Sequence, residues 1–473
     1  MTADAPSTPA AATPAAAKPP PTPLEQVPAK APAPVSFAEA LRFWLKLGFV
    51  SFGGPAGQIA IMHTELVERR RWISEQRFLH ALNYCMLLPG PEAQQLATYI
   101  GWLMHRTWGG IVAGALFVLP SLFILIGLAW IYLRFGDVPV VAGIFYGLKP
   151  AVTALVLHAA HRIGTRALKN YWMWAIAAAA FIAIFALDTP FPAIVAAAAL
   201  IGHFGARRWP RIFALGGGHG GALKHYGAAL IDDTTPTPAH ARWSRSQLIK
   251  VLAVGVGLWA LVMGTLVAAQ GMQGLFAQMG WFFTKAALLT FGGAYAVLPY
   301  VYQGAVEQHQ WLSGAQMIDG LALGETTPGP LIMVVAFVAF VGAWLKQALG
   351  PDALFLAGAL AATVVTFFTF LPSFVFILAG GPLVEATHGK LGFTAPLSAI
   401  TAAVVGVILN LALFFAYHVL WPTGLGGRFD VVAALIAVAA ALALFRFKVG
   451  VISLLAACAA AGLVVTLLFP TLH

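Results

Sequence analysis

The sequence predicts an all-α membrane protein that crosses the bilayer many times and is built from two homologous halves. Of its 473 residues, 60% are apolar and only 9% are charged, and the mean hydropathy is +0.83. An ordinary globular chain carries about 25% charged residues, so a soluble enzyme, a nucleic-acid-binding protein and a disordered protein are all disfavoured. The apolar residues suffice for a dozen or so crossings of about 20 residues each, and two parts of the chain repeat each other.

The chain begins with a segment that we do not expect to fold. Residues 1–35 contain 10 Pro and 11 Ala with almost no large apolar residues, so burial cannot offset the entropy of ordering them. We expect a disordered cytoplasmic tail and no signal peptide. The net charge of +10 is spread along the chain, so we expect no nucleic-acid partner. Cys85 and Cys458 lie far apart in apolar stretches, which is typical of buried thiols.

The first half opens with two pairs of short apolar segments, and each pair is split by a Gly/Pro motif. The motifs are SFGGPAG at 51–57 and LPGP at 88–91. Proline disfavours helix in the residue before it and glycine permits a tight turn, so we expect broken or re-entrant helix hairpins. The short segments cover residues 37–52, 57–68, 78–88 and 92–105. Four longer helices follow at 110–133, 138–161, 172–187 and 191–204, and after a polar stretch one unmatched helix covers 247–269.

The chain then repeats its first pattern. A shift of 239 residues aligns 46–91 with 285–330 without a gap, and a shift of 252 aligns the Leu-Pro-Ser run at 119–121 with the one at 371–373. Chance does not give such a series in order, so we infer two copies of one membrane unit. The matched residues are Lys46 with Lys285, Glu68 with Glu307, Trp72 with Trp311, Ser74 with Ser313, the Phe-Gly-Gly runs at 52–54 and 291–293, and the Pro-Gly-Pro runs at 89–91 and 328–330.

Charge predicts that the two copies are inverted. Arg69, Arg70, Arg71 and Arg77 of the first copy align with uncharged residues at 308–310 and 316 of the second. Because short Arg- and Lys-rich loops stay in the cytoplasm, one loop is inside and its twin outside. We therefore expect a tail (1–35), a first repeat (36–206), a basic cytoplasmic linker (207–246), an inverting transmembrane helix (247–270) and a second repeat (271–473).

Inverted repeats with broken helices are typical of secondary transporters, whose substrate binds near the middle of the membrane. Pro91 and Pro330 each follow a break and would start a helix, where free backbone amides bind anions. Two such helix starts would converge on one anion from opposite sides. The alternative is a pair of structural kinks.

Polar residues flank both breaks at depths where they are costly. Glu92, Gln94, Gln95 and Thr98 open the segment after the first break, and Glu325 with Thr326 and Thr327 closes the segment before the second. A carboxyl group within the membrane suggests function. For Glu92 the sequence does not decide between a proton carrier and an acidic residue that balances the helix dipole.

Two lysines occupy matched positions six residues before each Phe-Gly-Gly run. Lys46 and Lys285 would bring two positive charges near the axis relating the repeats, which fits a doubly charged oxyanion; the alternative is that each extends to the membrane interface. Lys149 is a weaker candidate because Thr401 is its counterpart. His158 and His161 lack further ligands for a metal, and GGGHGG at 216–221 lacks the Gly-Lys-Ser/Thr ending of a nucleotide loop. We expect no cofactor, no metal and no enzymatic activity.

These motifs together resemble the bacterial chromate ion transporters of the ChrA type, in their long form with two homologous halves. The resemblance rests on FGGP with Gln58, RRRWIS at 69–74, LPGPEAQQ at 88–95 and, in the second half, FGG and ETTPGP at 325–330. It implies a bacterial inner-membrane protein that exports chromate and confers chromate resistance. From the charge pattern and the number of crossings we expect a cytoplasmic N-terminus and a periplasmic C-terminus. The second half departs from the first, since Pro55 becomes Ala294 and Glu92 becomes Leu331, so the halves need not contribute equally.

The repeat and the resemblance together define the candidate substrate-binding residues. They come from the two lysines, the two Phe-Gly-Gly regions and the two breaks: Lys46, Ser51, Phe52, Gly53, Gly54, Pro55, Gln58, Pro89, Gly90, Pro91, Glu92, Gln94, Gln95, Lys285, Thr290, Phe291, Gly292, Gly293, Glu325, Thr326, Thr327, Pro328, Gly329 and Pro330.

The sequence leaves other functions open. The expected partners are the lipid bilayer and chromate, with sulfate as a close analogue in charge, shape and size; a sulfate or other oxyanion carrier is therefore an alternative. An anion channel is another, and a membrane-embedded chromate reductase would need a flavin, haem or nicotinamide site for which the sequence has no motif. The coupling ion and any oligomer are also left open.

Overall fold

The computed structural model describes residues 32–52, 54–209, 226–387 and 394–468, and the regular elements within them are helical apart from one isolated parallel bridge between Ile73 and Ile231. Six described helices are long and apolar enough to cross a membrane, and three shorter apolar helices accompany them. This is fewer than the dozen crossings that the apolar residues allow. The difference arises because the breaks leave several segments too short to span a bilayer alone.

The helices of the first half follow the predicted order. They are α1 (Phe37–Val50), α2 (Gly54–His63), the π-helix η1 (Thr64–Arg69), α3 (Glu75–Cys85), α4 (Glu92–Phe135), α5 (Pro139–Ala167), α6 (Tyr171–Leu187) and α7 (Phe191–Arg208). The predicted segments 92–105 and 110–133 both lie in α4, and non-helical backbone angles at His105 and Arg106 separate them.

A linker and a single helix connect the halves. The linker includes the 3-10 turn η2 (Ala239–Ala241) and leads into α9 (Arg245–Gln270). The second half consists of α10 (Leu275–Leu289), α11 (Ala294–Tyr302), the π-helix η3 (Gln303–Gln308), α12 (Gly314–Thr326), the 3-10 turn η4 (Leu331–Met333), α13 (Val334–Leu345), η5 (Pro351–Ala353), α14 (Leu354–Thr387), α15 (Thr394–Leu420), α16 (Val431–Phe445) and α17 (Val451–Leu468).

The local geometry of the first half recurs in the second at the shift of 239. The π-helices η1 and η3 occupy equivalent residues, and the residues that follow them, Arg71 and Gln310, both have a left-handed backbone. Ser74 and Ser313 cap α3 and α12 by accepting a hydrogen bond from the amide three residues on. Equivalent sequence motifs therefore give equivalent turns, which supports the division into two halves.

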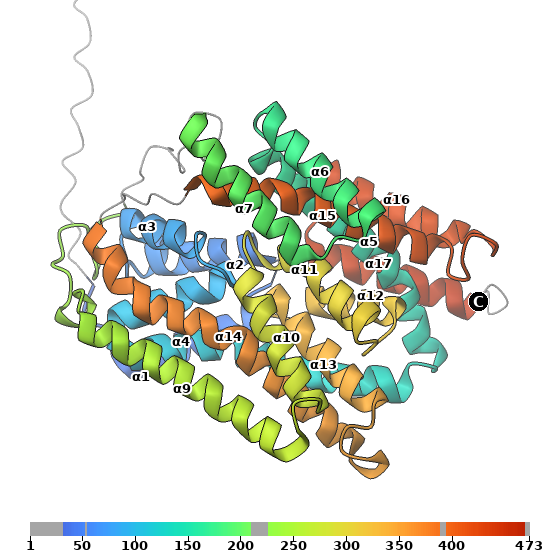
Figure 1. Cartoon of the computed structure of the whole chain (residues 1–473), viewed down its shortest axis with the longest axis horizontal. Helices are drawn as coiled ribbons and strands as arrows, with labels where there is room; N and C mark the ends of the chain where they lie inside the picture. The colour runs from blue at the N-terminus through green and yellow to red at the C-terminus, as the bar shows by residue number, and fades with distance from the viewer. Residues whose placement is uncertain (1–31, 53, 210–225, 388–393, 469–473) are drawn as a thin grey trace, which may run out of the picture.

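The two halves pack against each other through their long helices. α5 contacts α15, α16 and α17, and α4 contacts α13 and α14 (Figure 1). Small residues permit close approach between helices: a Cβ at Gly147 of α5 would lie 1.9 Å from the carbonyl oxygen of Cys458 in α17. α13 is buried along almost its whole length. Gly90, Pro91 and residues 327–330 are buried as well, so both breaks reach into the interior of the molecule.

Candidate functional site

The two breaks are joined to the opposite halves by a reciprocal pair of backbone hydrogen bonds. The amide of Gly90 donates to the carbonyl oxygen of Thr290 at 2.7 Å, and the amide of Gly329 donates to that of Ser51 at 2.8 Å. Gly329 is the repeat equivalent of Gly90, and Thr290 is that of Ser51. Each Pro-Gly-Pro break therefore contacts the end of the first helix of the other half, as a two-fold relation requires.

Backbone geometry explains the glycine at each break. Gly90 has φ +128° and Gly329 has φ +104°, a region that residues with a Cβ rarely adopt. Space is also lacking, since a Cβ at Gly90 would lie 2.4 Å from Ser373 Oγ and one at Gly329 would lie 2.8 Å from Ser121 Cβ. The breaks are tightly packed turns against the long helices α4 and α14.

Ser121 and Ser373 are therefore also a reciprocal pair, each lying beside the break glycine of the opposite half. Both belong to the repeated Leu-Pro-Ser run and are fully buried. Neither hydroxyl has a hydrogen-bond partner in the part of the chain that the structure describes. A buried hydroxyl without a partner is costly, so these two donors are available to a ligand.

The helix after each break starts without a side-chain cap. Pro91 precedes α4 and Pro330 precedes η4, and neither helix start receives a capping hydrogen bond from a side chain. First-turn amides have no acceptor within their own helix, whereas the amides of the break glycines are already used in the reciprocal pair. The predicted anion donors are thus the amides after the prolines.

Buried amide and hydroxyl side chains line the first turn of α4. Gln95 Nε2 donates to the carbonyl oxygen of Pro89 at 2.8 Å, and Gln94 Nε2 donates to Thr98 Oγ1 at 3.0 Å. The Oε1 atoms of both glutamines have no partner among the described residues. Gln58 of the first half donates to the carbonyl oxygen of Gly329 in the second half at 2.5 Å. Its repeat equivalent is Val297, so this contact occurs in one direction only.

Two carboxyl groups lie close to the start of α11. Glu325 is buried and accepts a hydrogen bond from the hydroxyl of Tyr295, and Glu92 Oε1 lies 4.0 Å from the position that a Cβ on Gly293 would take. Arg162 of α5 interacts electrostatically with both carboxyl groups, and Arg166 with Glu92. Neither carboxyl group has an ion-pair partner within 4 Å among the described residues. The centre therefore combines two acidic groups with basic groups at longer range.

The matched lysines lie elsewhere. Lys46 and Lys285 are exposed on the outer faces of α1 and α10, and Lys285 Nζ lies over the ring of Trp281 at 6.0 Å. The prediction that they flank the axis between the repeats does not fit these positions. A repeat alignment fixes the sequence position but not which way the helix face turns. Lys149 lies near Asp319, at 3.5 Å.

The other predicted residues divide by burial. Ser51, Gln58, Gly90, Pro91, Gln94, Gln95, Thr290, Gly293, Glu325, Thr327, Pro328, Gly329 and Pro330 are buried, and Phe52, Gly54, Pro55, Pro89, Glu92, Phe291, Gly292 and Thr326 are partly buried. The hydroxyls of Thr326 and Thr327 bond to the carbonyls of Leu323 and Gly324 and so cap α12. Gly53 lies outside the described residues.

The sequence reasoning missed several residues of this centre. Ser121 and Ser373 were available as part of the repeated Leu-Pro-Ser run, but the run was used only to align the repeats. The sequence does not mark Arg162 or Tyr295 as site residues, because neither stands in a duplicated motif. Their role follows only from the packing of α5 and α11 beside the breaks.

The helices, the paired breaks and the buried polar centre are those of a polytopic membrane protein with two homologous halves. The profile of the chromate transporter family matches residues 38–203 and 277–463, which covers most of both halves. The chain therefore belongs to the chromate transporter family, and it is a transporter rather than an enzyme.

Known relatives agree with this placement. A chromate transport protein of Pseudomonas aeruginosa is 33% identical over 380 residues, which cover 80% of each chain. One of Cupriavidus metallidurans is 28% identical over 415 residues, covering 87% of this chain and 88% of the relative. The uncharacterized transporter YwrB of Bacillus subtilis matches over 133 residues, 68% of its own length. Such a relative is about as long as one half. No solved structure matches this chain significantly.

Proposed function

We propose that this protein is a secondary transporter that exports chromate across the bacterial inner membrane and thereby confers chromate resistance. The observation that carries the proposal is the reciprocal contact between the breaks, beside which lie two serine hydroxyls, at equivalent positions, that have no hydrogen-bond partner among the described residues. Chromate is a tetrahedral dianion, so donors from two sides suit it. Relatives named chromate transport proteins support this substrate class.

We infer that the halves are inverted across the membrane. The equivalent turns after η1 and η3 are rich in arginine in the first half and in neutral residues in the second, and the positive-inside rule assigns them to opposite sides. A two-fold axis in the membrane plane is the usual origin of a central site in secondary transporters. The arginine-rich turn, the N-terminus and the linker are then cytoplasmic, and the C-terminus is periplasmic.

The substrate site in this proposal lies between the breaks. The amides that start α4 and η4 and the hydroxyls of Ser121 and Ser373 donate to the oxyanion, while Arg162 balances its charge from α5. Such donors are stronger away from water than in it. Because the breaks are tightly packed around Gly90 and Gly329, the described arrangement is closed, and binding requires the halves to separate.

The proton is the coupling ion that best fits the centre. Glu92 and Glu325 lie where a dianion would pass, and an ionised carboxylate repels it. We therefore propose that a carboxyl group at this centre takes up a proton during the transport cycle, so that chromate movement and proton movement are coupled.

Chromate uptake into inside-out vesicles tests the proposal. Uptake should saturate, should require an imposed gradient, and should show a KM about tenfold higher or more in Ser121→Ala and in Ser373→Ala, because each loses a hydrogen bond to a charged ligand worth about 1.5–3 kcal/mol. Thr363→Ala, which removes an exposed hydroxyl from the same helix as Ser373, should behave as wild type. An unchanged KM in both serine variants would remove the proposed site. Competition by sulfate and molybdate separates a chromate exporter from a general oxyanion carrier, and non-saturating flux would indicate a channel.

Sidedness has its own test. In a background with Cys85 and Cys458 replaced by alanine, Arg69→Cys and Gln308→Cys should react with an impermeant thiol reagent from opposite sides of the membrane. Labelling from the same side would refute inversion.

A further inference from the structure

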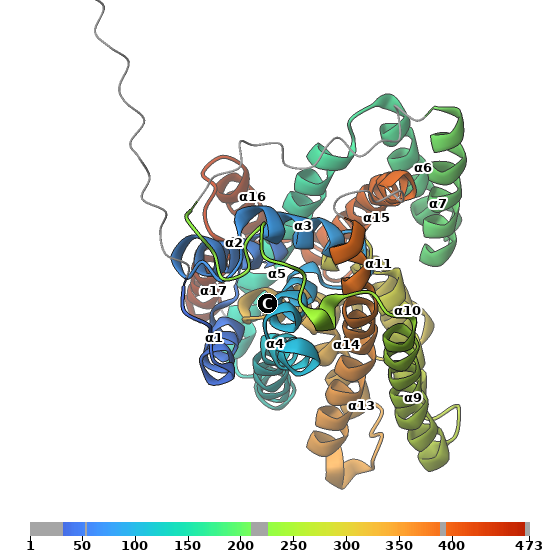
Figure 2. The same ribbon diagram turned by 90° about the vertical axis from the view of Figure 1, so that its left-hand side faces the viewer.

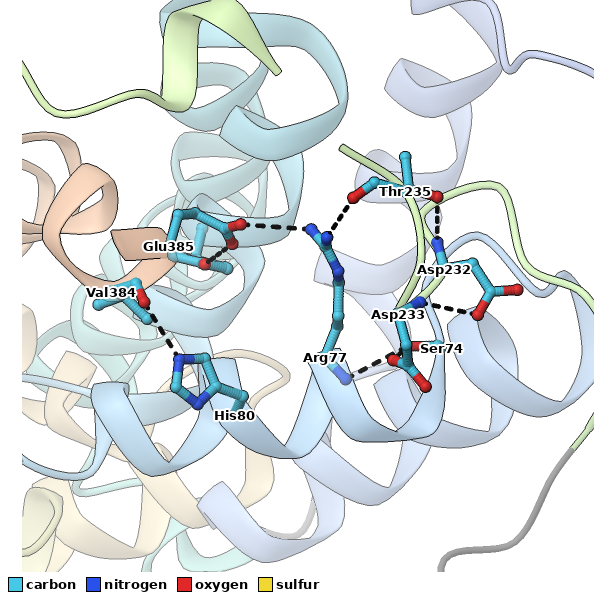
Figure 3. A network of polar contacts seen from close by, with 9 residues as sticks. Ser74, Arg77, His80, Asp232, Asp233, Thr235, Val384 and Glu385 are labelled. Carbon is cyan, nitrogen blue, oxygen red and sulfur yellow. Dashed lines mark hydrogen bonds and ion pairs between the residues drawn. The ribbon is translucent and has the colours of Figure 1, made fainter. Parts of the chain in front are cut away.

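A buried polar cluster ties α3 and α4 of the first half to the C-terminal end of α14. Arg77 of α3 donates to Glu385 of α14 with an N–O distance of 3.2 Å, and Tyr99 of α4 donates to the other carboxylate oxygen. The side chains of Arg77 and Glu385 are 14% and 7% exposed. Figure 3 shows this cluster, in which His80 also contacts the carbonyl oxygen of Val384 at 3.3 Å. We name these residues the α3–α14 clamp.

The linker between the halves lies across this clamp. Ile231 bonds to Trp72 and Ser74 through its backbone, and Ser74 Oγ donates to Asp233 Oδ1 at 2.5 Å. Arg77 also donates to the carbonyl oxygen of Thr235 at 2.5 Å. Figure 2 views this face and shows the linker crossing it before α9 begins. Arg77 thus joins three segments, two of them beyond the first half.

A second buried cluster ties α12 of the second half to the C-terminal part of α4 and to α5. Tyr132 of α4 donates to Asp319 Oδ2 of α12 at 2.9 Å, and Lys149 of α5 lies 3.5 Å from the same oxygen. Asp319 is almost completely buried, while Lys149 is about one-third exposed. We name these residues the α12–α4 clamp.

The two clamps occupy equivalent places in the two halves. The shift of 239 relates His80 to Asp319, and the shift of 252 relates Tyr132 to Val384. Contacts between α3 and α14 therefore match those between α12 and α4, although the residue types differ. α3 and α12 lie on opposite sides of the molecule (Figure 1). Two equivalent contacts, one on each side of a central site, are what two gates require.

We propose that the α3–α14 clamp and the α12–α4 clamp are the two gates of alternating access, and that the linker fastens the first of them. This inference rests on the proposed transport function. When the α3–α14 clamp opens, Arg77 leaves Glu385 and Thr235, so the linker must loosen at the same time. When the α12–α4 clamp opens, Asp319 leaves Tyr132 and Lys149. Both are closed in the described structure, which fits an occluded state.

Distances between spin labels test the gates without any measurement of transport. Labels at Asn83→Cys on α3 and Leu383→Cys on α14, both exposed positions, span the first clamp in a background without Cys85 and Cys458. We expect two distance populations. Arg77→Ala should raise the longer population at least twofold, whereas Arg69→Ala, which breaks an exposed ion pair within η1, should leave it unchanged.

Weakening the second clamp should change the longer-distance population between α3 and α14 in the opposite direction. Asp319→Asn weakens the α12–α4 clamp and should lower the longer population across α3 and α14, because opening one gate requires the other to be closed. A purely structural role for either cluster gives no such reciprocal shift. One unchanging distance in wild type, Arg77→Ala and Asp319→Asn would overturn the proposal.

Cross-linking connects the gates to transport. A reducible thiol cross-link between His80→Cys and Val384→Cys should lower chromate uptake at least tenfold, and reduction should restore it. A cross-link between Glu65→Cys and Arg69→Cys, within η1, should have no effect. Full uptake with the first cross-link in place would overturn the gate. Absence of chromate uptake in the wild type, together with two distance populations, would instead refute the proposed substrate and leave the gate intact.

Discussion

Replacing Gly90 by alanine tests whether the Pro-Gly-Pro breaks are rigid, closely packed turns. The backbone at Gly90 has φ +128°, and a Cβ there would lie 2.4 Å from Ser373 Oγ and 2.6 Å from Gln95 Nε2. A side chain in such a backbone region costs about 1–3 kcal/mol. Crowding in a well-packed interior adds about 1–3 kcal/mol. Together these predict a loss of about 2–6 kcal/mol.

The assay is thermal unfolding of purified protein in detergent, combined with vesicle uptake. Gly90→Ala should unfold several degrees below wild type, and uptake should fall because Gly90 also anchors the break to Thr290. Gly257→Ala is the matched control: Gly257 lies in α9 with no neighbouring atom within 4 Å of an added Cβ, so alanine there should be neutral or slightly stabilising.

A second variant separates crowding from backbone strain. Ser373→Ala removes the nearest clashing atom, so the double variant Gly90→Ala with Ser373→Ala should recover part of the lost stability, and the two changes should not be additive. The backbone cost should remain. If Gly90→Ala unfolds at the wild-type temperature and transports at the wild-type rate, the account of the breaks is wrong.

Three further predictions follow from the positions of charged groups. Lys46→Ala and Lys285→Ala should each leave the KM for chromate within about twofold of wild type in vesicle uptake, because both side chains face outward. A KM raised more than tenfold in either variant would show that the lysines belong to the substrate site. Glu325→Gln should remove most of the pH dependence of uptake between pH 6 and 8, and an unchanged pH profile would exclude Glu325 as the proton carrier. Burial, together with the nearby charge of Arg106, lowers the pKa of His240, so the released linker binds a proton more readily than the docked one, and docking should weaken as the pH falls below the ordinary histidine value of about 6.5. Hydrogen exchange of residues 229–241, corrected for its intrinsic pH dependence, measures this, and His240→Gln should show no such trend.

The repeat made much of the fold predictable. Proline and glycine act locally, so the breaks at 88–91 and 328–330 could be placed from the sequence. The same is true of the interruption in α4 near His105, which divides two predicted segments. Duplication strengthened each of these predictions, because chance motifs do not recur in order.

The site was less predictable because its contacts join distant segments. Gln58 lies 271 residues from Gly329, to which it bonds, and Arg77 lies 308 residues from Glu385. No local pattern carries such a pairing. The prediction for the two lysines does not fit the structure for a related reason. Their equivalent positions in the two halves suggested a place near the axis, but a two-fold relation brings equivalent residues together only if they already lie near that axis. Ser121 and Ser373 each lie beside the break glycine of the opposite half, whereas Lys46 and Lys285 are exposed.

The charges at the centre constrain how an anion crosses it. A dianion about 5 Å from an ionised carboxylate, at an effective dielectric constant of about 20, is disfavoured by about 7 kcal/mol. Hydrogen bonds from two serine hydroxyls, at about 1.5–3 kcal/mol each for a charged partner, do not reliably offset this. Arg162 and Arg166 supply two positive charges at longer range, which balance the charges of Glu92 and Glu325 but leave the two charges of the dianion unbalanced. In the proposed mechanism, chromate therefore binds between the breaks more tightly when a carboxyl group has taken up a proton, so the affinities for proton and anion rise together, each by the same factor.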